Sequence, residues 1–122
     1  MIRLPLQSIK HFNIHYLNEE DNKLTITKKV EDGKMTLALE DRLDTTTAPQ
    51  LENELKVSLY EINELTLDLE KLEYLSSAGL RVLLAAQKQM EKQGGEMVVK
   101  NANETIMEVF EVTGFVDIIT IK

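Results

Sequence analysis

The sequence contains no cysteine and no long run of apolar residues. Without cysteine the chain has no disulfide, no thiolate nucleophile and no cysteine-type zinc site, and the reducing cytoplasm is the expected compartment. The N-terminal segment lacks the unbroken apolar stretch of a signal peptide or a membrane span, because it is interrupted by Arg3, Pro5, Gln7, Lys10 and His11. We therefore expect a soluble, cytoplasmic protein.

The chain also has few basic residues relative to acidic ones. The 14 basic side chains are outnumbered by 21 acidic ones, which gives a net charge of -7. Such a charge opposes non-specific binding to nucleic acid or to an anionic membrane, so neither is an expected partner. The length of 122 residues and the hydrophobic content of 43% are typical of one globular domain.

Two segments, residues 34–44 and 64–72, alternate apolar and polar residues with the period of a strand that buries one face. The apolar positions of these segments are Met35, Leu37, Leu39, Leu65, Leu67 and Leu69. Shorter strand candidates are residues 25–30, 95–100 and 117–122. A tight hairpin turn is expected at Asp32-Gly33, since this dipeptide adopts positive φ angles readily.

Three helices are expected between these strands. The first follows the sequence DTTTAP, where Asp44 and the threonines offer capping oxygens and Pro49 suits the first turn. The second begins within SSAG and ends near QGG, because glycine takes the left-handed conformation that terminates a helix. The third starts behind Asn103 and stops at Gly114.

The order of these elements is β-β-α-β-α-β-α-β. A strand covered by helices on both faces reads as a continuous apolar run, whereas polar residues occupy every second position here. We therefore predict an α/β two-layer sandwich, a mixed sheet of about five strands with three helices on one face. Phe12, Ile14 and Tyr16 alternate like an additional edge strand, but polar residues break the pattern. Residues 1–22 are thus predicted to be an N-terminal extension of uncertain order, and residues 23–122 the domain.

The chain offers little for catalysis or for metal binding. His11 and His15 stand four residues apart, a spacing that brings two imidazoles together on a helix, but no third ligand is evident. Both histidines lie in the extension, and SSAG differs from the GxSxG turn of serine hydrolases. We predict no metal site, no cofactor and no enzymatic activity.

Two adjacent serines open the second helix. Ser76 is expected to be an ordinary N-cap, its hydroxyl accepting a hydrogen bond from an amide of the first turn. Ser77 follows at the positive end of the helix, where unpaired amides and the helix dipole favour an anion. A phosphoryl group can be accommodated on Ser77.

The same helix has apolar residues on two flanks. Leu80 and Leu84 lie roughly 100° from the main apolar stripe, on the flank that carries Ser77, Arg81 and Lys88. They either pack against a neighbouring helix or form a small docking patch beside Ser77. The main stripe, which is expected to be buried against the sheet, consists of Val82, Leu83, Ala86 and Met90.

Three segments in order closely resemble the STAS domain, in particular the stand-alone bacterial anti-sigma factor antagonists: GKMTLALEDRLDTTTAPQLENEL, LTLDLEKLEYLSSAGLRVLLAAQK and GGEMVVKNANETIMEVFEVTGFVDII. The resemblance covers about residues 23–122 and implies a mixed sheet with helices on one side. The family motif is D-S-x-G-L or S-S-x-G-L, and its serine, here Ser77, is phosphorylated by a partner that is both anti-sigma factor and kinase. This chain has Ser76 where many members carry aspartate, and Asp41 where a glycine is common.

The resemblance implies a partner-switching mechanism. The unphosphorylated protein is expected to bind the anti-sigma factor and so release the sigma factor; phosphorylation of Ser77 ends this contact, and a serine phosphatase restores it. Two alternatives stay open, a regulatory subunit of a lipid-transport ABC system and a stressosome-like scaffold component. The residues expected at the partner contact are Asp44, Thr45, Ser76, Ser77, Ala78, Leu80, Arg81 and Leu84.

Overall fold

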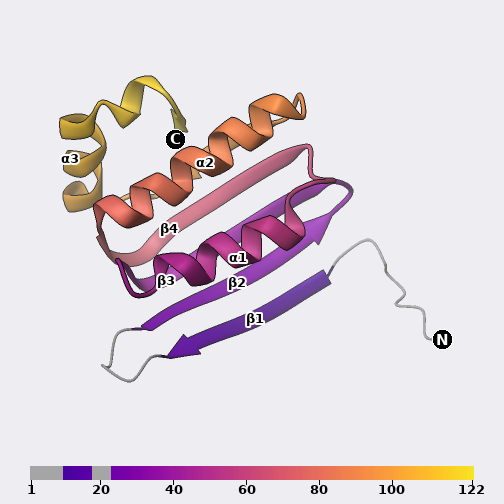
Figure 1. The fold of residues 1–122 in the computed structure, drawn as a ribbon, viewed down its shortest axis with the longest axis horizontal. Helices are drawn as coiled ribbons and strands as arrows, with labels where there is room; N and C mark the ends of the chain where they lie inside the picture. Colours follow the sequence, from indigo (N-terminus) through magenta and orange to yellow (C-terminus); the bar gives the residue numbers. More distant parts are fainter. Residues whose placement is uncertain (1–9, 18–22) are drawn as a thin grey trace.

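A computed structural model describes residues 10–17 and 23–122, and within these ranges six strands form one mixed sheet in the order β1-β2-β3-β4-β5-β6. Figure 1 shows β1 to β4 side by side. β1, β2 and β3 are antiparallel neighbours, and β3 to β6 pair in parallel. The elements are β1 Lys10–Leu17, β2 Lys23–Glu31, β3 Lys34–Leu43, α1 Ala48–Ser58, β4 Glu64–Leu75, α2 Ser77–Lys92, β5 Glu96–Lys100, α3 Glu104–Thr113, a 3₁₀ turn Phe115–Asp117 and β6 Thr120–Ile121.

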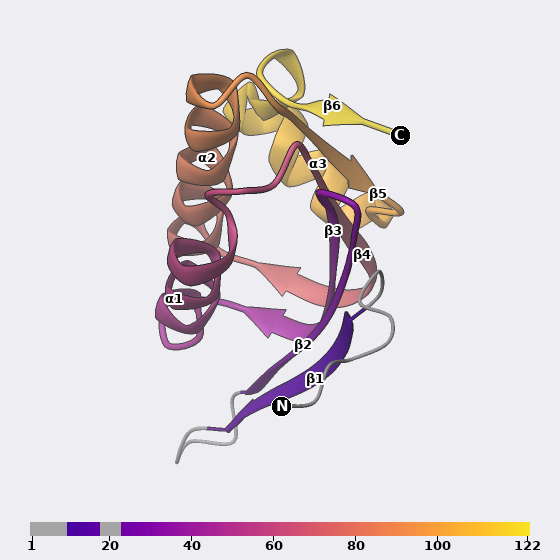
Figure 2. The ribbon, with the colours of Figure 1, turned by 90° about the vertical axis from the view of Figure 1, so that its right-hand side faces the viewer.

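The three helices cover one face of the sheet, so the α/β two-layer fold expected from the sequence is confirmed (Figure 2). A helix lies in the connection between each pair of parallel strands, and each new strand is added on the same side of the previous one. Because such connections are right-handed, all three helices lie on the same face of the sheet. The alternating leucines of β3 and β4 point into the layer between sheet and helices and are 0–1% exposed. Polar residues of the opposite face, such as Thr36 and Thr66, are half-buried.

β1 is the strand beyond the five expected ones, and it lies inside residues 1–22. Its backbone pairs with β2 over the whole strand, with Ile14 opposite Ile26 and Tyr16 opposite Leu24. Residues 1–9 and 18–22 fall outside the described ranges, and the boundary between residues 22 and 23 stays a prediction. At the other edge of the sheet, the strand expected over residues 117–122 is reduced to β6.

Positive φ angles occur at two acidic residues, Asp32 just before β3 and Asp41 within it. Asp32 (φ 51°) and Gly33 (φ 81°) form the turn between β2 and β3, as expected from the sequence. Asp41 (φ 82°) lies where the pairing of β3 with β4 shifts register, so the strand is bulged there. Asp41 therefore occupies the left-handed conformation that glycine adopts most easily.

Candidate functional site

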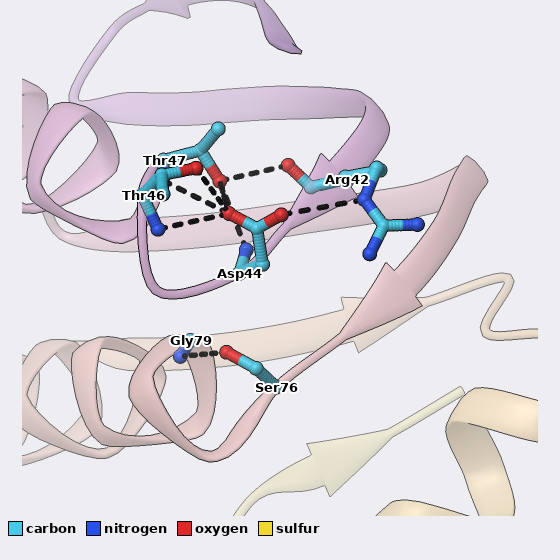
Figure 3. Close-up of polar contacts among 6 residues, drawn as sticks. All are labelled: Arg42, Asp44, Thr46, Thr47, Ser76 and Gly79. Carbon is cyan, nitrogen blue, oxygen red and sulfur yellow. Dashed lines mark hydrogen bonds and ion pairs between the residues drawn. The ribbon is translucent and has the colours of Figure 1, made fainter. Parts of the chain in front are cut away.

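The loop that follows β3 and the first turn of α2 meet at one edge of the sheet (Figure 3). β3 and β4 are parallel, so their carboxyl ends lie together, and the Ser76 amide donates a hydrogen bond to the Leu43 carbonyl at 2.9 Å. Gly79 allows a close approach at this point, because a Cβ on it would lie 2.7 Å from Leu43 and 2.8 Å from Leu75. The sheet therefore fixes the loop and the helix start relative to each other.

Asp44 organises the loop between β3 and α1. It is 8% exposed, and its Oδ1 accepts hydrogen bonds from the Thr46 amide at 3.0 Å, the Thr46 hydroxyl at 2.8 Å and the Thr47 amide at 3.1 Å. Arg42 Nε donates to the other oxygen, Oδ2, at 3.3 Å. Asp44 therefore holds the amides of the turn before α1, but the N-cap of the helix, Thr47, makes no side-chain capping bond, so the capping expected from Asp44 and the threonines is not seen.

The ionised form of Asp44 is favoured in this setting. Burial acts to raise the pKa of the carboxyl group, but the hydrogen bonds from the Thr46 hydroxyl, the Thr47 amide and Arg42 outweigh that effect and hold the pKa below its usual value. The loop is therefore built around a fixed negative charge whose hydrogen bonds are made within the protein.

The two serines have different environments. Ser76 is the N-cap of α2, with extended backbone and with its Oγ accepting a hydrogen bond from the Gly79 amide at 3.3 Å. Ser77 is the first residue of the helix, and its side chain is exposed. The capping role expected for Ser76 is seen in the structure, and the Ser77 hydroxyl is accessible to another protein.

The residues expected at a partner contact do not all reach the surface. Thr45, Ser77 and Arg81 are exposed, and Ser76, Ala78 and Leu84 are partly exposed. Asp44 and Leu80 are each 8% exposed. Of the two readings of Leu80, packing against neighbouring elements fits its burial, and a place in an exposed docking patch does not. Leu84 packs partly against the core.

Sequence reasoning missed Arg42 and Tyr74. The Arg42 guanidinium carbon lies 4.3 Å from the centroid of the half-exposed Tyr74 ring, in addition to the ion pair with Asp44. The two residues come from neighbouring strands, at paired register positions beyond the bulge. The local sequence carries no signal for this contact, which depends on the register of β3 against β4.

A shallow groove separates α1 and α2 on the outer side of the helix layer. Its first part, of about 260 Å³, lies next to the start of α2 and is lined by Thr45, Pro49, Ala78, Arg81 and other residues. It shares Glu52, Val82 and Ala85 with a second part of about 330 Å³ that extends to Tyr60 and Gln89. The exposed surface around Ser77 therefore continues into a groove between the two helices.

The described residues contain neither a cluster of potential metal ligands nor a helix that could cross a membrane. Residues 23–122 hold no group of three or more potential metal ligands, and His11 and His15 lie on β1, a strand whose side chains are outside the description. The helical spacing considered for these histidines therefore does not apply. In the same described ranges, every helix is too short or too polar to cross a membrane.

Comparison with known proteins gives consistent matches. The model of the STAS domain matches residues 25–122. The putative anti-sigma factor antagonist BtrV of Bordetella bronchiseptica is 39% identical over 97 residues, which are 79% of this chain and 82% of the relative. The anti-sigma-B factor antagonist of Bacillus subtilis is 28% identical over 99 residues, covering 81% of this chain and 91% of the relative.

Solved structures agree on the fold. An anti-sigma factor antagonist from Mycobacterium paratuberculosis superposes with a TM-score of 0.75 at 22% identity, over 87% of this chain and 89% of the other. The unphosphorylated form of the anti-sigma factor antagonist SpoIIAA superposes with a TM-score of 0.64 at 14% identity, over 91% and 87%. At these identities the structural matches establish the arrangement of strands and helices.

Proposed function

The chain belongs to the STAS domain family, and from this premise we propose that it is an anti-sigma factor antagonist switched by phosphorylation of Ser77. Unphosphorylated, it binds an anti-sigma factor with serine kinase activity and frees the sigma factor. Phosphorylation ends this binding, and a serine phosphatase resets it. The protein is then a ligand and a kinase substrate rather than an enzyme, and it acts in the cytoplasm.

The position of Ser77 carries the proposal. Its exposed side chain stands at the first residue of α2, while the neighbouring Ser76 hydroxyl is engaged in capping the helix. Thr45 of the adjacent loop and Arg81 of the next helical turn are also exposed. A partner that contacts the start of α2 therefore meets Ser77 together with these side chains. The curated relatives named anti-sigma factor antagonists support the same assignment.

The charge of a phosphoryl group explains how such a contact is switched. Phosphoserine carries about -1.5 to -2 charges at pH 7, where the unmodified side chain is a neutral hydroxyl. When this charge is desolvated or repelled at a partner surface that fits the neutral hydroxyl, the binding free energy weakens by about several kcal/mol. The sheet and the loop around Asp44 hold the site in place, so the switch needs no refolding.

A binding titration tests the proposal. The anti-sigma factor encoded in the same genome is titrated with the wild type, with Ser77→Ala, with Ser77→Asp, and with Ser76→Asp as a matched charge control. We expect tight binding of the wild type and Ser77→Ala, and a loss of at least about tenfold for Ser77→Asp. Equal binding of Ser77→Asp and the wild type, or no binding of any variant, would contradict the proposal.

A further inference from the structure

We propose that Arg81 is the internal counter-charge of the phosphorylated protein, pairing with a phosphoryl group on Ser77. This inference rests on the proposed function, because it assumes that Ser77 is modified. It adds that phosphorylation does more than introduce negative charge at the docking surface. It also neutralises a positive charge that the unmodified protein presents there.

The spacing of the two residues carries the inference. Ser77 and Arg81 are four residues apart in the first turns of α2, a helix of 16 residues, and both are exposed. Residues four apart are neighbours on a helix surface, and an acidic group that precedes a basic one by four positions is the favourable orientation. The phosphoryl group also lies at the positive end of the helix dipole. Both effects draw the phosphate towards the first turns of α2.

Within residues 23–122, the Arg81 guanidinium has no ion-pair partner. Among residues 23–122 the recorded ion pairs are Lys23 with Asp41, Lys28 with Glu54 and Arg42 with Asp44. None of them involves Arg81. Glu52 of α1 lines the same groove as Arg81, but no ion pair joins them. Within this part of the chain, no ion pair competes with the phosphate for the guanidinium group.

Arg42 and Lys88 are less suitable counter-charges than Arg81. Arg42 already pairs with Asp44 and stacks on Tyr74, so it would have to leave both contacts. Lys88 is on the same exposed stripe of α2 as Ser77, but it is 11 residues further along, roughly 16 Å at 1.5 Å per residue. Of these three cations, only Arg81 lies one helical turn from Ser77 and has no ion-pair partner within residues 23–122.

The experiment uses the full chain with phosphoserine incorporated at position 77 during translation, so neither kinase nor partner is needed. The second ionisation of the phosphate is followed by phosphorus NMR between about pH 4 and pH 9, around its usual value near 6. Arg81→Gln should raise this pKa by about 0.2–0.4 units, the size of one helical ion pair. Arg81→Lys, which keeps the charge, should leave it near the wild-type value.

Two control variants make the result decisive. Lys88→Gln removes the same charge from the same helix and should shift the titration by less than half as much as Arg81→Gln. Arg42→Gln tests the rival counter-charge. Equal shifts for Arg81→Gln and Lys88→Gln, or a larger shift for Arg42→Gln, overturn the inference. No partner is present in this NMR experiment. The inference can therefore fail while the binding titration with the anti-sigma factor still supports switching. Equally, the binding titration can fail while the NMR experiment still supports the pairing of Arg81 with the phosphate.

Discussion

Ser76 Oγ accepts a hydrogen bond from the Gly79 amide at 3.3 Å, whereas the adjacent Ser77 presents an exposed side chain. The hydroxyl that stabilises the start of α2 is thus not the hydroxyl offered to solvent. Substitutions of these two neighbouring serines should therefore have different effects. It leads to a prediction about both modification and stability.

We predict that the cognate kinase modifies Ser77 and not Ser76. Ser77→Ala should abolish incorporation of phosphate and leave the free energy of unfolding nearly unchanged, because the side chain is exposed. Ser76→Ala should cost about 1 kcal/mol, the usual effect of losing an N-cap, and should still be phosphorylated. Mass-spectrometric mapping and denaturant unfolding measure the two effects. Phosphate found mainly on Ser76, or on Thr45 to Thr47, would show that the assignment is wrong.

A second prediction concerns acid stability and Asp44. The pKa of Asp44 is lowered in the folded protein, so its ionised form stabilises the fold above the ordinary carboxyl pKa of about 3.9. This contribution is lost as the pH falls through the lower, folded-state pKa. Asp44→Asn should therefore be less stable than the wild type at pH 7, and the difference should shrink below about pH 4.

Urea unfolding of both proteins at several pH values between about 2.5 and 7 measures this difference. Glu52→Gln, which removes an exposed carboxylate of α1, is the control for the loss of a negative charge elsewhere on the surface. A difference between Asp44→Asn and the wild type that stays constant down to the lowest pH would contradict a role for the ionised carboxylate.

Much of the fold follows from local pattern in the sequence. The alternation at Leu37 and Leu67 predicts one buried face, and both residues are 0% exposed. The ends of α3 are set by local chemistry: the Asn103 side chain accepts a hydrogen bond from the Ile106 amide, and Gly114 takes a φ of 82°. These features were predictable because each depends on a few neighbouring residues.

The features that the sequence did not predict depend on contacts between helices and strands. Leu80 is buried although it lies off the main apolar stripe of α2, and the periodicity of one helix does not show which neighbouring elements cover its flank. The contact of Arg42 with Tyr74 depends on the register of two parallel strands across a bulge. At the candidate site, the capping role of Ser76 follows from its neighbours in sequence, while the burial of Asp44 follows from the packing of its loop.

The third prediction tests backbone strain at Asp41. This residue has a φ of 82°, which costs a non-glycine residue about 1–2 kcal/mol. Glycine removes that cost but gives the unfolded chain more freedom. Its ion pair with the exposed Lys23, at 3.7 Å, contributes little. Asp41→Gly should therefore raise the free energy of unfolding by about 0.5–1 kcal/mol.

Asp41→Ala is the matched control, because it also removes the carboxylate but keeps the Cβ atom in the left-handed conformation. It should be less stable than Asp41→Gly by about 1 kcal/mol in denaturant unfolding. Equal stability of the two variants would mean that the backbone at this bulge relaxes without strain. The conclusion that Asp41 occupies a glycine-like position would then fail.

The last prediction distinguishes core packing from docking on α2. Leu83 is 0% exposed, whereas the adjacent Leu84 is only partly buried. Leu83→Ala should lower the free energy of unfolding by about 2–5 kcal/mol, as the loss of a buried leucine usually does. Leu84→Ala should cost well under that amount, because part of its surface is already in contact with solvent.

If the exposed part of Leu84 belongs to the docking surface beside Ser77, Leu84→Ala should also weaken binding to the anti-sigma factor by at least about 1 kcal/mol. Denaturant unfolding and a binding titration of both variants measure the two quantities on the same proteins. Leu83→Ala serves as the control for indirect effects, since any binding loss it shows must come through the stability of the fold. A Leu84→Ala variant that is destabilised as much as Leu83→Ala, with no binding defect of its own, would place Leu84 in the core and remove it from the docking surface.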